Sequence, residues 1–267
     1  MANKINLPNI ESAIKKGLMK GYKENILLQS SYNSFHSKVA EYLLTICIAQ
    51  NLLIWNANQN EHSRYKIFLE YPSKQFINNA FISSKYIDNS TIFNMNKEYR
   101  LKHQPFGKQS GRIDIAISEE DIGENLGNPL SLIGIEVKAI NQNYYLILSD
   151  IERLSQMILE TDTIGQNNIN AGYCIFLENM FKEKNLADNR TISLLKSKCL
   201  QKWNERITKF NCDHGIKITT EVFDVEKSAE EDVRQSHKEQ ESDYEAVARD
   251  TGLVLGVLIK ILRVTDD

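Results

Sequence analysis

Two short segments of alternating residues carry the charged side chains that could act together in catalysis. They are Gly-Arg-Ile-Asp-Ile-Ala-Ile at 111–117 and Leu-Ile-Gly-Ile-Glu-Val-Lys-Ala-Ile at 132–140. Their alternation predicts two β-strands. Side chains two residues apart on a strand point to the same face, so Glu136 and Lys138 should lie side by side. If the two strands pair, Asp114 joins them on that face.

Such a group of charges suits metal-assisted hydrolysis of a phosphodiester. Mg²⁺ prefers oxygen ligands, takes one or two carboxylates and fills its other positions with water and phosphate oxygens. Asp114 and Glu136 would be those carboxylates, with the carbonyl of Val137 as a further ligand. Mn²⁺ accepts the same ligand types and is the expected substitute. Lys138 would orient or deprotonate the attacking water, or stabilise charge developing on the phosphate.

The alternative is that Glu-x-Lys is an ion pair on an exposed strand face. The surrounding residues favour a buried setting. Ile113, Ile115 and Ile117 are expected to share the opposite face of the first strand, and the second strand is almost entirely apolar apart from its two charges. Strands of this kind are usually central and covered on both faces. Charged groups in that position need a partner or a metal.

Asp114, followed on the next strand by Glu136-Val137-Lys138, resembles the PD-(D/E)XK nuclease superfamily. Ile113 stands where the name-giving proline would be. The resemblance covers residues 35–177, with a strand-like run at 97–101 before the Asp114 strand. It implies a restriction-endonuclease-like α/β fold, in which a mixed central sheet is flanked by helices on both faces.

The same resemblance implies a Mg²⁺-dependent endonuclease. Its expected substrate is nucleic acid, with double-stranded DNA favoured, and its expected role is restriction or anti-phage defence. A homo-oligomer or a partner protein of a defence system would fit that role. Two other functions stay open: a catalytically silent DNA-binding or assembly subunit with this fold, and an α/β interaction protein whose resemblance is accidental. Whether the three charged side chains converge distinguishes the last of these.

Glu41 is a fourth candidate for the site. It interrupts the apolar middle of a helix predicted from Ser34 to Asn51, with Ser34 as its N-cap. In the superfamily that the chain resembles, a glutamate from the helix before the core strands often joins the metal site, and Glu41 matches that placement. The alternative, an exposed glutamate paired with Lys38 or another neighbour, is equally compatible with the sequence.

Basic and polar residues outside these strands are candidates for contacts with nucleic acid. Some lie in or just after a turn-rich loop at 103–111, which is otherwise a plain hairpin connection. Others lie on a predicted helix at 143–161, and the last pair lies on a basic helix at 189–211, which is otherwise an amphipathic surface helix. The candidates are Lys108, Gln109, Arg112, Arg153, Gln156, Lys198 and Lys202.

The remaining pattern predicts how the chain is organised. We expect an N-terminal helical segment at 1–30, a nuclease-like core at 31–225, and a charged linker with an apolar C-terminal element at 226–267. Predicted strands are 65–71, 93–102, 172–177 and 217–223, the last at an edge of the sheet, and residues 252–264 form either a strand returning to the sheet or a helix for association.

Composition is that of an ordinary globular protein. The 267 residues are 42% hydrophobic and 25% charged, with a net charge of −3, so a nucleic-acid footprint would have to be local. The four cysteines show no C-x-x-C spacing, and Cys47 and Cys174 lie in apolar runs, which predicts reduced, buried thiols. Without a secretory or membrane-spanning run, the expected location is cytoplasmic, away from membranes.

Overall fold

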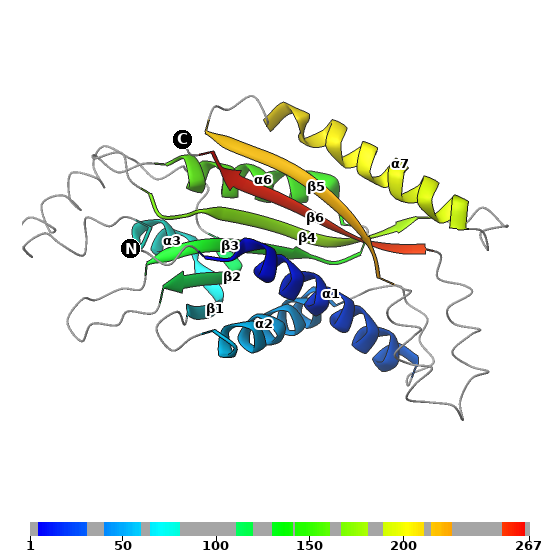
Figure 1. The fold of residues 1–267 in the computed structure, drawn as a ribbon, viewed down its shortest axis with the longest axis horizontal. Helices are drawn as coiled ribbons and strands as arrows, with labels where there is room; N and C mark the ends of the chain where they lie inside the picture. Colours follow the sequence, from blue (N-terminus) through cyan, green and yellow to red (C-terminus); the bar gives the residue numbers. More distant parts are fainter. Residues whose placement is uncertain are drawn as a thin grey trace, which may run out of the picture.

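The computed structural model describes residues 5–30, 40–59, 65–80, 111–119, 130–140, 142–160, 167–180, 189–210, 215–225 and 253–264 (Figure 1). Five α-helices, one short 3₁₀-helix (Thr208–Phe210) and six strands lie in these ranges. The helices are α1 (Leu7–Ser30), α2 (Glu41–Ala57), α3 (Ser73–Asn78), α6 (Tyr144–Leu159) and α7 (Asn189–Ile207). The strands are β1 (Tyr65–Pro72), β2 (Arg112–Glu119), β3 (Ser131–Lys138), β4 (Ala171–Met180), β5 (Ile216–Asp224) and β6 (Leu253–Arg263).

The strands form one mixed sheet in the order β1-β2-β3-β4-β6-β5. β3 and β4 pair in parallel and are joined through α6, which makes a strand–helix–strand crossover from the strand at 132–140, the helix at 143–161 and the strand at 172–177 that the sequence predicts. The other neighbouring pairs are antiparallel. β5 is at an edge of the sheet, as expected. The apolar C-terminal segment is a strand and not a helix: β6 lies between β4 and β5, inside the sheet.

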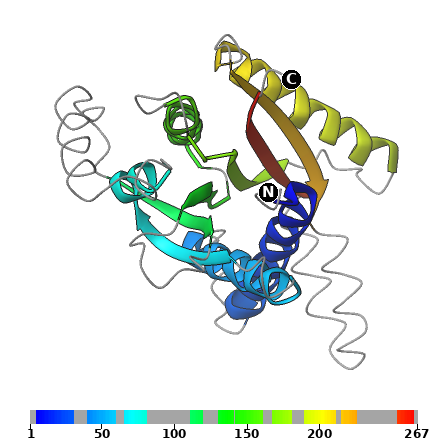
Figure 2. The same cartoon turned by 60° about the vertical axis from the view of Figure 1, so that its left-hand side comes forward.

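Helices cover both faces of this sheet (Figures 1 and 2). One core cluster joins α1 and α2 to the sheet through residues such as Ile14, Ile48 and Ile135. A second cluster joins α3, α6 and α7 to the opposite face through residues such as Phe76, Leu154 and Trp203. The chain is therefore an α/β protein whose central strands are buried from both sides, in agreement with the predicted class.

Two glycines set the spacing of α1 and α2. A Cβ added to Gly17 would lie 2.4 Å from the Cα of Ile48, and one added to Gly21 would lie 3.0 Å from the Cα of Leu44. The two helices therefore touch backbone to backbone. Glu41 is the first residue of α2, so this close contact between the helices also fixes the position of Glu41.

The predicted limits of α2 were wrong. Ala40 has an extended backbone (φ −72°, ψ 111°), and the helix begins at Glu41 and continues past Asn51 to Ala57. The amide of Ala40 donates a 3.2 Å hydrogen bond to Oδ1 of Asn25 in α1, which anchors the chain just before the first turn. Tertiary contact with α1 sets this boundary. Ser34 and Lys38 lie outside the described residues.

The isoleucines of β2 do not all share one face. Ile115 and Ile117 pack in the cluster with α1 and α2, whereas Ile113 packs in the other cluster with Tyr71. The expected alternation fails because the strand pairing changes here. The β2–β3 ladder begins at Ile115, and on the neighbouring strand Glu70 has a positive φ of 51°.

Several predicted features lie outside the described residues: the strand at 93–102, most of the loop at 103–111 with Lys108 and Gln109, and the charged linker that begins at residue 226. Cys47, Cys174 and Cys199 are buried free thiols, which confirms the prediction for the first two. No helix in the described ranges is both long enough and apolar enough to cross a membrane.

Candidate functional site

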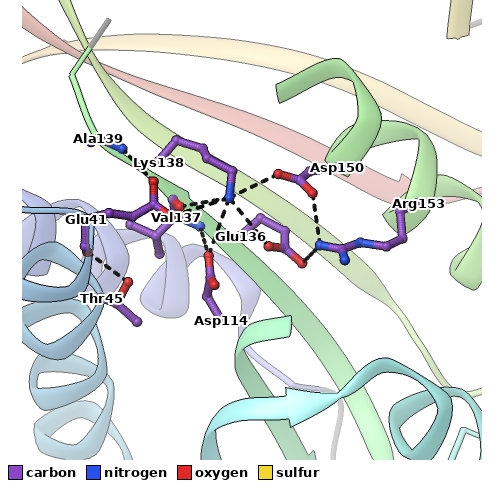
Figure 3. Close-up of polar contacts among 9 residues, drawn as sticks. All are labelled: Glu41, Thr45, Asp114, Glu136, Val137, Lys138, Ala139, Asp150 and Arg153. Carbon is purple, nitrogen blue, oxygen red and sulfur yellow. Dashed lines mark hydrogen bonds and ion pairs between the residues drawn. The ribbon is translucent and has the colours of Figure 1, made fainter. Parts of the chain in front are cut away.

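Four carboxylates from four different elements surround the ammonium of Lys138 at the end of β3 (Figure 3). Among them are the three predicted partners from α2, β2 and β3. The distances from Lys138 Nζ to the nearest carboxylate oxygens are 3.1 Å to Asp150, 3.8 Å to Glu41, 3.9 Å to Asp114 and 4.0 Å to Glu136. Nζ also donates to the carbonyl of Val137 at 3.2 Å. The predicted site residues are thus brought together around one cation.

Asp114 is held where β2 and β3 separate. The ladder between these strands runs from the Ser118 end to the Ile115–Ile135 pair. Beyond it the amide of Val137 donates instead to Oδ2 of Asp114 at 2.7 Å. A side-chain carboxylate thereby replaces a backbone acceptor in the ladder and is aimed at the end of β3.

Glu41 reaches the same place from the start of α2. Its Oε2 accepts a 3.2 Å hydrogen bond from the amide of Ala139, the residue after Lys138. Its side chain is 39% exposed, the most open of the four carboxylates. The structure therefore supports its placement beside the cluster, as the resemblance implied.

α6 supplies the fourth carboxylate and the second cation. Asn143 caps the helix by accepting from the amide of Tyr145 at 3.1 Å. Two turns later, Arg153 Nη2 donates to Oδ1 of Asp150 at 2.9 Å and to Oε1 of Glu136 at 2.5 Å. Arg153 and Asp150 are three residues apart and so share one helix face.

Asp150 was missed as a site residue at the level of sequence. Only Arg153 and Gln156 of the helix predicted at 143–161 were candidates. A usable signal was present: Asp150 and Arg153 lie at helical spacing just after the Glu-x-Lys strand. A crossover helix packs back over the strand that precedes it, so a polar pair on its inner face points at that strand's charges.

Glu136 is a buried carboxylate in a crowded acidic setting. Its side chain is 1% exposed, which excludes a solvated surface pair. Burial raises the pKa of Glu136 well above its ordinary value, and Asp150 adds to this, while Arg153 opposes it. Its register partner on β4 is Cys174. Burial also raises the pKa of the Cys174 thiol, so the residue beside Glu136 on the neighbouring strand is a neutral thiol.

Lys138 is a firmly charged ammonium. Its side chain is 14% exposed. Burial alone would lower the pKa of Lys138, but the carboxylates around it, with Asp150 first, raise the pKa above its ordinary value. In the absence of another cation, Lys138 is therefore protonated at neutral pH and acts as a donor.

The cluster has a deficit of positive charge. With all four carboxylates ionised, they and the two cationic side chains give the six residues a formal charge of −2, which is the charge one divalent cation would balance. The donors are hard oxygen ligands of the type that Mg²⁺ prefers. No group of three or more His, Cys, Asp or Glu in the described ranges is already arranged around a metal position. Instead, the Lys138 ammonium lies among the carboxylates (Figure 3).

The nucleic-acid candidates fall into different places. Arg153 is in the site, and Gln156 lies on the same helix without a hydrogen bond or ion pair to the four carboxylates, as far as the described residues go. Arg112 is 66% exposed at the start of β2 and lies 3.9 Å from Glu70. On α7, Lys202 pairs with Glu178, while Lys198 is exposed. The α7 candidates are thus on a separate helix from the cluster.

Comparison of the chain with protein-family models, with curated proteins and with solved structures finds no match.

Proposed function

We propose that this protein is a Mg²⁺-dependent nuclease that hydrolyses phosphodiester bonds, with double-stranded DNA as its substrate. One observation carries the proposal. Asp114, Glu136 and Glu41, on three elements far apart in the chain, converge on Lys138 with a surplus of negative charge. The mixed sheet with helices on both faces is compatible with the restriction-endonuclease-like fold that the sequence resembles, which we include in the proposal.

The residues divide the work by their chemistry. Asp114, Glu136, the carbonyl of Val137 and Glu41 would hold Mg²⁺, which when bound supplies Lewis-acid polarisation of a phosphate oxygen and a more acidic water. Lys138 is held as a cation beside them. It would orient the attacking water and stabilise the negative charge that develops on the phosphate.

The charge of the cluster predicts that the divalent cation binds before the nucleic acid. A cluster with formal charge −2 repels a polyanion, so a divalent cation would favour the approach of the phosphate. Arg153, in the site, and Arg112, exposed on β2, are the proposed phosphate contacts on this side of the molecule. A second copy of the chain or a partner protein of a defence system would supply further contacts to the nucleic acid. Such an assembly is part of the same proposal.

The test is cleavage by the purified full chain. Plasmid, single-stranded DNA and RNA are each incubated with Mg²⁺, with Mn²⁺ or with EDTA. We expect cleavage of plasmid that needs the cation, and a loss of about 10²-fold or more in rate for Asp114→Asn and for Lys138→Gln. The substrate panel reads out the preference between DNA and RNA.

Two matched variants control for general damage. Glu221→Gln and Lys260→Gln remove a carboxylate and a lysine from an ion-paired group on β5 and β6, where Lys260 Nζ lies 2.9 Å from Glu221 Oε2. Both are expected to keep the wild-type rate. Cleavage that survives Asp114→Asn and Lys138→Gln would refute the site, and a folded protein that cleaves none of the substrates would favour the silent binding subunit.

A further inference from the structure

We propose that Arg153 is a latch on the candidate cation site. Its guanidinium occupies the Glu136 oxygen that a divalent cation would need, and it releases that oxygen when the cation binds. The inference rests on the proposed function, because it concerns the same carboxylates. It adds a statement about regulation: the affinity for the cation is set by a residue that is not a ligand.

The contact that forms the latch is short and buried. Arg153 Nη2 lies 2.5 Å from Oε1 of Glu136, whose side chain is 1% exposed. Water therefore has little access to this carboxylate. A guanidinium and a divalent cation repel each other, so both cannot be held at full strength by one carboxylate. The charge-assisted hydrogen bond must weaken before the cation gains Glu136.

The guanidinium has a second partner that remains when Glu136 is released. The same Nη2 donates to Asp150 Oδ1 at 2.9 Å, one helical turn away on α6. Arg153 is 22% exposed, so it also reaches solvent. Opening the latch would therefore not leave a buried, unpaired charge, which is the outcome that makes broken buried pairs so unfavourable.

The closed position is also imperfect for Arg153. Its Nε is buried and has no hydrogen-bond partner among the described residues. On its other side, a Cβ added to Gly111 would lie 2.6 Å from Nη1, so the backbone there confines the guanidinium. An arginine that is confined and incompletely hydrogen-bonded loses less free energy on moving toward Asp150 and solvent than a fully hydrogen-bonded arginine would.

Lys260 provides a matched control. It also bridges two carboxylates, with Nζ 2.7 Å from Glu11 and 2.9 Å from Glu221. Glu11 belongs to α1, so this group lies on the α1 side of the sheet, whereas Arg153 lies on α6 across it. Removing Lys260 removes the same kind of bridge without touching the candidate site.

The experiment measures Mn²⁺ binding to the full chain by electron paramagnetic resonance, without nucleic acid. Arg153→Gln is expected to bind Mn²⁺ on the order of tenfold more tightly than wild type. Arg153→Lys, which keeps the positive charge but not the planar guanidinium, is expected to lie between them. Lys260→Gln should bind as wild type does. Circular dichroism checks that each variant is folded.

The outcomes separate the latch from the proposed function. If the wild type binds Mn²⁺ and Arg153→Gln binds it equally tightly or more weakly, the latch alone is overturned. If Arg153→Gln fails to fold, Arg153→Lys carries the test and must bind more tightly than wild type. Absence of Mn²⁺ binding in every folded variant would overturn the latch together with the metal site, whereas binding seen only in the Arg153 variants would support both.

Discussion

At the scale of single residues, the environment of each charge decides its role. Lys138 is surrounded by carboxylates and stays an ammonium, while Glu136 is buried and has a raised pKa. Both belong to the same Glu-x-Lys pattern, yet the surroundings of Lys138 favour its charged form, whereas those of Glu136 favour its neutral form. A bound divalent cation would reverse the balance for Glu136, because it favours the ionised carboxylate.

A second charged group, on the α1 side of the sheet, gives a prediction for pH. Burial alone would raise the pKa of Glu221, but hydrogen bonds from Lys15 and Lys260 lower it below its ordinary value. A carboxyl whose folded pKa is lowered stabilises the fold above its unfolded pKa, and this stabilisation is lost as pH falls through the folded value.

Glu221→Gln should therefore lower the free energy of unfolding at pH 7 by about 0.5–1 kcal/mol, the range for partly exposed ion pairs. The difference from wild type should shrink as pH falls below the ordinary carboxyl pKa of 4.5, because Glu221 of the wild type is then protonated and neutral, as the glutamine already is. Urea unfolding of both proteins at a series of pH values measures this. A difference that stays constant down to pH 3 would contradict the assignment.

At the scale of elements, the close contact of α1 and α2 positions Glu41. Gly17 and Gly21 are four residues apart on α1 and face the backbone of α2. Small residues at this spacing let two helix backbones approach, and any side chain there must push them apart. The position of Glu41 beside the amide of Ala139 therefore depends on residues that never touch the site.

Gly17→Ala tests this dependence. Alanine is the better helix former by about 1 kcal/mol. The added methyl group would nevertheless meet the Ile48 backbone at 2.4 Å, where nothing can rotate away. We expect a net destabilisation of about 2 kcal/mol in urea unfolding, and a lower rate of cleavage because α2 shifts. Lys16→Ala, at an exposed position of the same helix, should stay within about 0.5 kcal/mol of wild type. Equal stability of Gly17→Ala and wild type would show that the helices can separate without cost.

At the scale of the whole molecule, β6 ties the end of the chain into the sheet. It pairs with β4 on one side and with β5 on the other, and its side chains enter both core clusters. A strand in this position connects the edge strand β5 to the rest of the sheet. The fold is therefore closed by a segment more than a hundred residues beyond Lys138.

A chain that ends at residue 252 should fail to fold, although it keeps the described site residues. Removing β6 exposes both core clusters and leaves β5 without its neighbour in the sheet. Far-UV circular dichroism and urea unfolding of the shortened chain, compared with the full chain, measure the effect. Cooperative unfolding of the shortened chain near the wild-type midpoint would contradict it.

Much of the architecture follows from local pattern. The apolar runs of β3 and β4, the crossover helix between them and the alternating edge strand β5 were all predictable, because burial on both faces selects branched aliphatic residues and exposure on one face selects alternation. The placement of Asp114, Glu136 and Lys138 on one side of a strand pair was predictable for the same reason. Period-two geometry fixes the side of each residue once pairing is assumed.

Other features were decided only by tertiary structure. The start of α2 depends on Asn25, fifteen residues earlier, and the departure of Ile113 from alternation depends on where β2 leaves β3. Asp150 and Arg153 became site residues only because α6 packs back over β3. The sequence by itself determined which charges this protein carries and on which strands they alternate. The packing of separate elements decided which of those charges meet, because electrostatic contact depends on distance in space and not on separation along the chain.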